Sequence, residues 1–408
     1  MIFLIEFLKI LNVILSIYFS LAVIYTLTLS IGAFFYKDNS VSFTLTKSKI
    51  AIVVPAYKED SVILHSILEH LSLNYPSDLF HVFLAADSLM EGTLIKLSQL
   101  PITVIKVEFE ISTVTKSVKS AVFSLNPLEY PITLICDADN ILEKNFLNKI
   151  NSGFQLGMKA IQGRRFTKNL NTPMAVLDSL SEIINNHLFK KGSYALGLSA
   201  ALIGSGMAFD TKLLQECLID NHSIGGYDRE LHLALSEKRV RIHYLENAVC
   251  YDEKVSTHQA FGNQRRRWLS SQFIDLKDHF KKSFQIIFQK GGFNYFQLGF
   301  LNNFFLPRVL NLGLLFIISL CNWILFWIWK PLGSLNPIFW FILFLVYLFS
   351  LALGVPKSFY NKTLFQALLT LPKTFLVMFF LLFKLKGANK RFLHTEHSIL
   401  DVEDNISG

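Results

Sequence analysis

The feature that most constrains the fold is an apolar run that begins at Ile10 and ends at Tyr36 without a charged side chain. A helix of about 20 apolar residues crosses the hydrocarbon core of a bilayer, so this run predicts a transmembrane anchor over residues 1–36. A cleaved signal peptide is the alternative, but it needs a basic start and an apolar region of roughly 7–15 residues. The start here is MIFLIEFLK and the run is too long, which favours the anchor.

Three further apolar segments lie near the C-terminus. Val309–Trp329 and Pro337–Gly354 each predict a transmembrane helix, and tryptophans crowd the boundary between them, as expected for rings at the headgroup level. The last segment, Leu364–Phe383, has Pro372 and Lys373 in its middle, and a lysine at mid-bilayer costs about 2.5–3.5 kcal/mol. We therefore expect this segment to lie in the interface or to re-enter from one side, with a simple fourth span as the alternative.

The distribution of basic residues predicts the orientation of the spans. Cytoplasmic flanks carry an excess of lysine and arginine, and such residues follow the first span and surround the last apolar segment. We expect a multi-pass protein of a cell membrane, most simply a bacterial inner membrane. The predicted parts are an N-terminal anchor (1–36), a cytoplasmic α/β domain (37–290), an interfacial segment (291–308), two transmembrane helices (309–354), and an interfacial or re-entrant helix with a cytoplasmic tail (355–408).

The region after the first span has the pattern of an α/β domain. Four runs rich in β-branched residues, KIAIVVPAY, FHVFLAAD, ITVIKVEF and PITLICDADN, alternate with helical stretches. This order predicts a mostly parallel central sheet with flanking helices. Ligands of such sheets bind beyond the carboxyl ends of the strands, where Asp87, Asp137 and Asp139 are expected.

Composition narrows the classes of partner. The net charge of +8 suits nucleic acid, an anionic membrane surface or a phosphorylated substrate. The basic residues lie mostly next to the spans, and no basic sheet interleaved with aromatics appears, so we expect no nucleic-acid partner. The four cysteines form no CxxC pair and complete no His/Cys ligand set, which disfavours a zinc site or a disulfide framework.

Asp137 and Asp139 place two carboxylates at the end of one strand. Two acids so close repel each other unless a cation lies near them. Hard oxygen ligands suit Mg²⁺ or Mn²⁺, and either ion can in turn hold a substrate diphosphate. An ordinary acidic turn capped by Asn140 is the alternative interpretation of these residues alone.

Asp228 lies in GGYDRELHLAL, residues 225–235, where Leu231 and Leu235 share a helix face. The carboxylate is predicted at the N-cap or in the first turn of that helix, a favourable position for a negative charge. A plain capping residue is one interpretation, and a general base that faces the metal site is the other.

Gln264, Arg267 and Trp268 form a QxxRW pattern inside QRRRW. Arginine can bind a diphosphate through two parallel hydrogen bonds, and tryptophan offers a flat apolar face to a sugar or a nucleobase. For Arg265 and Arg266, a basic segment attracted to anionic lipid, worth about 1 kcal/mol per charge, is an equal alternative.

Six motifs occur in the order and spacing of family-2 glycosyltransferases, namely IVVPAYKED, an Asp after the second strand, DADN, GSGMAF, YDRELHLAL and QRRRW. The chain resembles the membrane-embedded branch that includes cellulose, chitin, hyaluronan and poly-N-acetylglucosamine synthases. The resemblance covers roughly residues 48–275, and FLHTEH near the end is similar to a common C-terminal motif. It implies a GT-A-type nucleotide-sugar-binding domain in the α/β region.

The resemblance also implies roles for single residues. Asp228 matches the catalytic base, although Tyr227 replaces the acid that precedes it in the family. The implied metal ligands are Asp137 and Asp139, and the implied acceptor-side residues are Gly204, Ser205, Gly206 and Trp268. The implied nucleotide-sugar-binding residues are Tyr57, Glu59, Asp87, Lys116, Asp137, Arg164, Gln264, Arg267 and Trp268.

The activity that the resemblance implies is that of an inverting, membrane-bound hexosyltransferase that uses Mg²⁺ or Mn²⁺. It would move a hexose or N-acetylhexosamine from a nucleotide sugar, most simply a UDP-sugar, to a growing glycan or lipid-linked acceptor in cell-surface polysaccharide synthesis. The small number of predicted spans favours single addition, or a channel supplied by an export partner or a homo-oligomer. The alternative is a non-catalytic membrane protein of the same fold that binds nucleotide or glycan, and Tyr227 is the residue that favours it.

Overall fold

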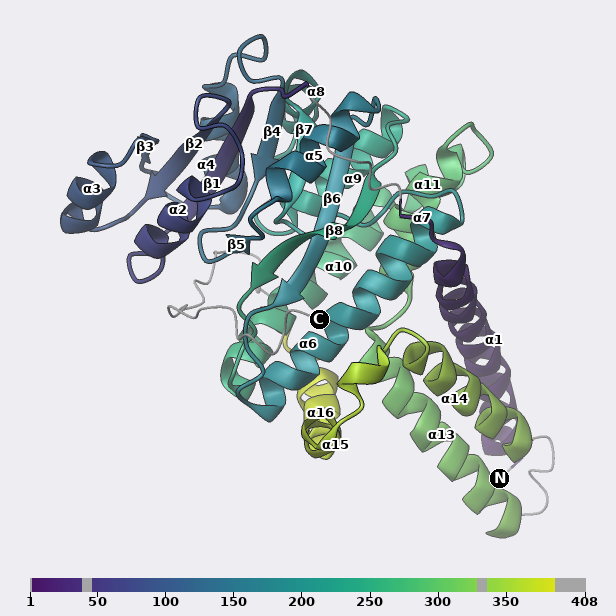
Figure 1. Cartoon of the computed structure of the whole chain (residues 1–408). Coiled ribbons are helices and arrows are strands. Elements are labelled where there is room, and N and C mark those ends of the chain that lie inside the picture. Colours follow the sequence, from purple (N-terminus) through teal and green to yellow (C-terminus); the bar gives the residue numbers. More distant parts are fainter. Residues whose placement is uncertain (1, 39–45, 329–335, 386–408) are drawn as a thin grey trace.

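The computed structural model describes residues 2–38, 46–328 and 336–385, and Figure 1 shows an α/β domain from which long helices extend. The N-terminal helix α1 (Ile2–Gly32) lies beside two helices from the C-terminal third, α13 (Arg308–Ile328) and α14 (Pro337–Ala352). Segments far apart in the sequence therefore form one helical projection. The FLHTEH motif lies outside the described residues.

A mixed sheet forms the centre of the domain, and within the described residues its strand order is β3-β2-β1-β4-β7-β6-β8-β5. The four predicted strands are confirmed as β1 to β4, which pair in parallel. The strands are β1 (Ile50–Tyr57), β2 (Phe80–Asp87), β3 (Thr103–Val107), β4 (Ile132–Ile135), β5 (Ile141–Leu142), β6 (Ala160–Thr167), β7 (Met207–Asp210) and β8 (His243–Asp252).

The expectation of a mostly parallel sheet is corrected in its second half. Strand β7 runs antiparallel to both β4 and β6, and β5 runs antiparallel to β8, whereas β6 and β8 are parallel. The reason is the connection between β6 and β7. The chain leaves the carboxyl end of β6 and enters β7 at the same end of the sheet, so the two strands point in opposite directions.

Each face of the sheet has its own apolar core, because alternate residues of a strand point to opposite faces. Ile52 of β1 packs with Ile67 on one face, and Val53 packs with Val122 on the other. Strands covered on both faces carry near-continuous apolar runs, as the sequence of β1 does. The surrounding helices are α2 (Ile63–Leu71), α3 (Glu91–Ser98), α4 (Val114–Phe123), α5 (Phe146–Gln155), α8 (Thr211–Leu218) and α9 (Tyr227–Glu237).

A further group of helices connects the domain to the projection. The long helix α10 (His258–Ile286) and α6 (Pro173–Asn185) lie between the sheet and the apolar helices. The shorter elements here are η1 (Ala33–Phe35), η2 (Asn186–Gly192), α7 (Ser193–Ala195), α11 (Gly292–Phe296), η3 (Gln297–Leu301), α12 (Asn302–Phe304) and η5 (Lys357–Phe359).

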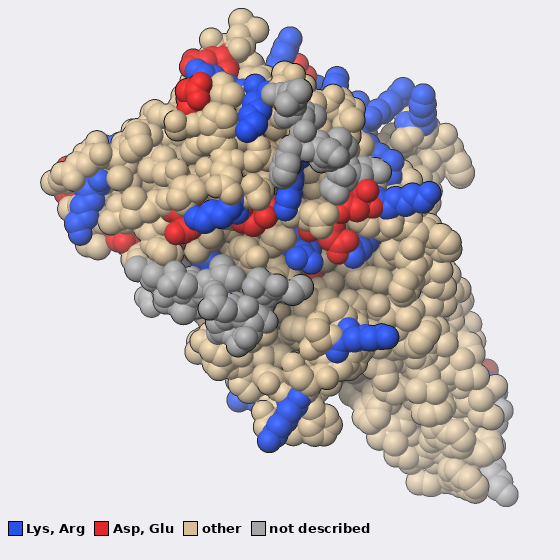
Figure 2. Space-filling view, in the orientation of Figure 1, with Lys and Arg blue, Asp and Glu red and all other residues tan. Residues whose placement is uncertain are grey.

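The projection is almost free of charge on the face that Figure 2 shows, whereas lysines, arginines and acids gather over the α/β domain. Within the described residues, two helical stretches are long and apolar enough to cross a membrane, Glu6–Phe35 and Arg308–Ile328. Helix α14 has 16 residues, which at 1.5 Å per residue gives about 24 Å, less than the roughly 30 Å of a hydrocarbon core. The prediction of a full-length span over 337–354 is therefore corrected, because the structure has a shorter apolar helix there.

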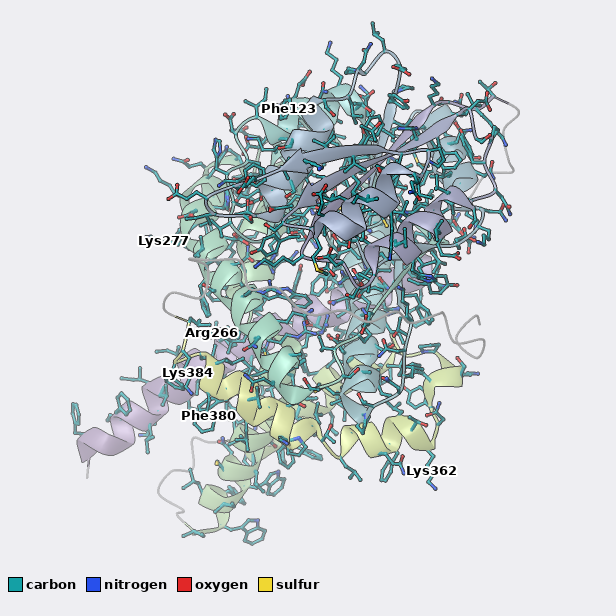
Figure 3. The ribbon with its side chains drawn as sticks, turned by 90° about the vertical axis from the view of Figure 1, so that its left-hand side faces the viewer. Phe123, Arg266, Lys277, Lys362, Phe380 and Lys384 are labelled. Carbon is teal, nitrogen blue, oxygen red and sulfur yellow. The ribbon has the colours of Figure 1, made fainter. Side chains whose placement is uncertain are left out.

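The last apolar segment is broken rather than straight. Helices α15 (Lys362–Leu368) and α16 (Leu371–Leu381) meet at an angle of 41°, and Pro372 stands in the first turn of α16. Such a pair is either a broken span or a re-entrant loop. Figure 3 shows α16 beside α10, where the Arg266 side chain donates from Nε to the Lys384 carbonyl at 2.6 Å.

Candidate active site

A cavity of about 1370 Å³ lies beyond the carboxyl ends of β1 and β4. Residues of these two strand ends, of α6, α9 and α10, and of the apolar helices α13 to α16 line it. Ligands of open α/β sheets bind at this edge. The cavity is therefore the candidate active site, and it continues from the sheet to the helical projection.

The end of β1 forms one wall of the cavity. Tyr57 and Glu59 line it, and Lys58 between them has a φ of 57°, in the left-handed region. The Lys58 amide donates to the Asp87 carbonyl at 3.1 Å, so the turn is tied to the neighbouring strand β2. Asp87 itself is fully buried, and its Oδ1 accepts a hydrogen bond from the Ser88 hydroxyl at 2.9 Å.

Asp137 and Asp139 follow β4 and line the cavity beside that wall. The Asp137 amide donates to Ser205 Oγ at 3.0 Å, and the Ser205 hydroxyl donates to Asn140 Oδ1 at 2.5 Å. These hydrogen bonds tie the turn after β4 to the loop before β7. Burial, and next the neighbouring Asp139 carboxylate, raise the pKa of Asp137 well above its ordinary value. The two carboxylates are thus neighbours, and the surroundings of Asp137 disfavour its negative charge.

These carboxylates fit a divalent cation. Asp139 is 7% exposed, and within the described part of the chain its Oδ2 atom is buried without a hydrogen-bond partner. No group of three or more His, Cys, Asp or Glu side chains suited to a metal occurs in the described residues. A site with one or two carboxylates is the usual form for Mg²⁺, whose remaining ligands are waters and substrate phosphates.

Asp228 lies in the first turn of α9 and faces the loop before β7. Its Oδ2 is 4.0 Å from the position that a Cβ on Gly204 would take, and Gly204 has a φ of +88°. The Tyr227 hydroxyl donates to the Gly204 carbonyl at 2.6 Å. Tyr227, which replaces the expected acid, therefore holds this loop against Asp228. Burial raises the pKa of Asp228, and the adjacent Arg229 offsets part of that rise.

Helix α10 presents Gln264, Arg267 and Trp268 to the cavity. These positions share a helix face because they are three and four residues apart. Arg265 also lines the cavity, with its guanidinium 4.1 Å from the Trp268 ring centroid and an ion pair to Asp178 of α6. Arg265 is thus committed inside the protein, and it is not a free lipid-facing charge.

Five of the residues implied by the resemblance lie outside the cavity lining as the described residues define it, namely Asp87, Lys116, Arg164, Ser205 and Gly206. Lys116 is exposed, and its ammonium donates to the Ile111 carbonyl at 2.7 Å. Its neighbours Thr115 and Ser117 line the cavity instead, because adjacent helical residues point in different directions.

Two adjacent arginines of strand β6 also differ in whether they face the cavity. Arg165 lines the cavity, whereas Arg164 lies over the Phe166 ring at 5.0 Å. Alternation along a strand sends neighbours to opposite faces, and the irregular register at Gly163 and Arg164 decides which arginine faces the cavity.

Sequence reasoning missed a buried ionic network around Glu182 in the cavity wall. Glu182 Oε2 accepts from Arg165 Nη2 at 2.9 Å, and Glu182 Oε1 accepts from Lys190 Nζ at 3.0 Å. Asp252 accepts from Lys254 Nζ at 2.6 Å and lies 3.7 Å from Arg165 Nε. No local sequence motif predicts this network. The only sequence signal is that KNL at 168–170 and NNHLFKK at 185–191 place lysines beside apolar runs.

Comparison with solved structures shows the fold. A mannosyltransferase, PcManGT from Pyrobaculum calidifontis in complex with GDP-Man and Mn²⁺, is 14% identical with a TM-score of 0.52 over 88% of this chain and 97% of that chain. TarS 1–349 of S. aureus in complex with UDP is 14% identical with a TM-score of 0.42, over 80% and 92% of the two chains. The UDP-GlcNAc complex of the same fragment has a TM-score of 0.40 at 14% identity, over 62% and 72%. The fold assignment is based on the first of these similarities, whose TM-score exceeds 0.5.

Comparison at the sequence level shows the family. No curated protein sequence matches this chain. The family model described as "Glycosyltransferase like family 2" matches residues 48–271, more than half of the chain. The matched region contains the sheet, the strand-end carboxylates and the first part of α10. The chain therefore belongs to glycosyltransferase-like family 2 and has its GT-A-like fold.

Proposed function

We propose that this glycosyltransferase is an inverting, membrane-bound enzyme. It moves a hexose or N-acetylhexosamine from a nucleotide sugar to a growing glycan or lipid-linked acceptor in cell-surface polysaccharide synthesis. The observation that carries the proposal is the convergence of Asp137, Asp139, Asp228, Arg267 and Trp268 on one cavity at the carboxyl ends of the strands. The alternative, a binding protein without activity, depended on Tyr227, and its hydrogen bond to Gly204 gives that residue a structural role beside an intact Asp228.

The donor nucleotide fits the sheet end of the cavity. Tyr57 and Glu59 would hold the nucleoside, and Asp137 with Asp139 would hold Mg²⁺ or Mn²⁺. The cation, when bound, supplies positive charge that neutralises the donor diphosphate. PcManGT is described with GDP-Man and Mn²⁺, which supports a nucleotide sugar and a divalent cation here. We favour a UDP-sugar because of the sequence resemblance.

The chain's own residues would perform the transfer by charge stabilisation and proton transfer. The Arg267 guanidinium would neutralise the leaving diphosphate, an interaction of the kind that usually provides the largest catalytic effect. The Asp228 carboxylate would take the proton of the acceptor hydroxyl, and its raised pKa makes it a better base. Trp268, which is 40% exposed, would form a flat face for the acceptor sugar.

The membrane assignment rests on the two long apolar helices and on the basic flanks in the sequence. We propose that α1 and α13 span a cell membrane, that the α/β domain is cytoplasmic, and that α15 and α16 lie in the interface or re-enter. So few apolar helices favour single addition, or a channel formed with an export partner or a second copy of the chain.

The test is the release of nucleoside diphosphate by the purified protein with a panel of UDP- and GDP-sugars and Mg²⁺ or Mn²⁺. We expect release with one donor, its loss on chelation of the metal, and a fall of about 10²–10⁴-fold in Asp228→Asn, the usual contribution of a general base. Asp220→Asn, at an exposed position, is the matched control. Equal release by Asp228→Asn and the wild type would contradict the assigned base, and nucleotide binding without turnover of any donor would support the non-catalytic alternative.

A further inference from the structure

The cavity changes character between its two ends. At the sheet end its walls carry carboxylates and polar side chains, whereas the lining residues from α13, α14 and α15 are mostly apolar. The apolar part is formed by helices that come together only in the folded protein, with walls that include Leu177, Leu180, Leu312, Leu348, Leu351 and Leu364. An elongated apolar group could enter this part of the cavity, but an uncharged wall alone does not say which group.

Arg308 stands where the two parts meet. It is the first residue of α13, lines the cavity, and donates hydrogen bonds to neutral groups of α6. Its Nη1 donates to Asn185 Oδ1 at 2.5 Å, and its Nη2 donates to the carbonyl and the hydroxyl of Ser181, each at 3.1 Å. Among the described residues, no carboxylate forms an ion pair with this guanidinium.

The acids nearest to Arg308 along α6 are already committed. Glu182 pairs with Arg165 and Lys190, and Asp178 pairs with Arg265. Among the described residues, the ion pairs around Glu182 and Asp178 join four cations to three carboxylates, and Arg308 adds a fifth cation; the groups are Arg165, Lys190, Lys254, Arg265 and Arg308 with Asp178, Glu182 and Asp252. A partly buried positive charge of this kind is costly unless an anion compensates it.

We propose that the junction is the acceptor's headgroup site and that the acceptor is a lipid with a phosphate headgroup. The headgroup lies on the Arg308 guanidinium, and the apolar chain lies in the part of the cavity walled by α13, α14 and α15. A guanidinium binds phosphate through two parallel hydrogen bonds. The apolar walls would contact the chain of a lipid, whereas a free phosphate ion would leave them without a partner. This inference rests on the proposed function and narrows its acceptor to one chemical class.

The test measures saturable binding of radiolabelled dodecyl phosphate to the full-length protein in phosphatidylcholine nanodiscs. Dodecanol supplies the chain without the charge, and inorganic phosphate supplies the charge without the chain. We expect dodecyl phosphate to bind at least about tenfold more tightly than either, because a hydrogen bond to a charged group and the burial of a chain each contribute that much. Equal affinity for dodecanol would overturn the charge recognition, and equal affinity for inorganic phosphate would indicate a free-anion site and overturn the lipid assignment.

Variants assign the headgroup to one residue. Arg308→Gln is expected to weaken binding of dodecyl phosphate by about tenfold or more, and Arg308→Lys, which keeps the charge but not the fork, by less. Lys277→Gln removes one exposed charge on α10 outside the cavity lining and is expected to bind as the wild type does. Unchanged binding by Arg308→Gln would refute the proposal.

The same samples separate this proposal from the proposed function. Nucleoside diphosphate release without acceptor is measured for the wild type and for Lys277→Gln, and we expect both to be equal because Lys277 lies outside the cavity lining. Wild-type protein that binds dodecyl phosphate but hydrolyses no donor would contradict the enzyme and not the lipid site.

Discussion

The substitution Glu182→Gln removes a single negative charge from a buried network without changing the size of the side chain. Glu182 is 5% exposed, and three cations surround it, with nitrogen–oxygen distances of 2.9 Å to Arg165, 3.0 Å to Lys190 and 3.8 Å to Lys254. Burial alone would raise the pKa of Glu182, but these cations hold it well below its ordinary value. The carboxylate is therefore ionised at neutral pH, and the variant removes one of the negative charges that compensate these cations.

The magnitude follows from the partners that remain. Arg165 and Lys254 keep Asp252, but within the described part of the chain Lys190 keeps only the neutral Asn186 as a side-chain hydrogen-bond partner. Removing one member of a buried ion pair typically costs about 3–5 kcal/mol. At about 2–4 °C per kcal/mol for a domain of this size, the thermal midpoint should fall by roughly 6–20 °C.

The loss should also depend on pH, through Lys190. Burial already lowers the pKa of Lys190 to about 8, and without Glu182 the pKa should fall further. Between its folded and unfolded pKa values a lysine binds fewer protons in the folded state, so stability rises with pH there. Stability therefore begins to rise at a lower pH in the variant than in the wild type. The stability difference between the two proteins should shrink as the pH is raised from 6 to 9.

The assay is thermal unfolding of the detergent-solubilised protein at pH 6 and pH 9. Glu216→Gln is the matched control, because the Lys238–Glu216 pair at 2.9 Å has side chains 40% and 44% exposed, and such surface pairs contribute about 0–1 kcal/mol. Equal midpoints for Glu182→Gln and Glu216→Gln would refute the assigned role of the network. A deficit that grows with pH would refute the role of Lys190 in it.

Two further predictions concern the support of the site. Gly206→Ala should lower the free energy of unfolding by about 1–3 kcal/mol, because the residue has a φ of +64° and a new Cβ would lie 2.9 Å from the Cys250 Cβ. Gly92→Ala is the control, because a Cβ there would meet nothing within 4 Å. Equal unfolding midpoints for the two variants would contradict the strain at Gly206. Burial lowers the pKa of His70 to about 4, so the unfolded state takes up the proton first and stability should fall by about 3 kcal/mol as the pH falls from 6.5 to 4. Denaturant titration across this range measures the effect, which His70→Met should reduce and the exposed His222→Gln should leave unchanged.

Much of the fold could be predicted because its signals are local. The strands β1 to β4 follow from β-branched runs, and the long helices α1 and α13 follow from runs without charge. The antiparallel entry of β7 could not be predicted, since four residues of β-pattern do not fix direction. The bend between α15 and α16 had a local signal in Pro372, which a helix tolerates only in its first turn.

The candidate site divides in the same way. The sequence alone predicts that acids follow the strands and that Gln264, Arg267 and Trp268 share a helix face, because these relations depend only on the periods of a strand and a helix. The packing of the elements determines that Arg165 and not Arg164 faces the cavity, that Tyr227 holds the Gly204 loop, and that Arg308 donates a hydrogen bond to Asn185 of α6. Those relations join residues that are distant in the chain, and the energies that select them, from burial and charge pairing, exist only once the elements have packed.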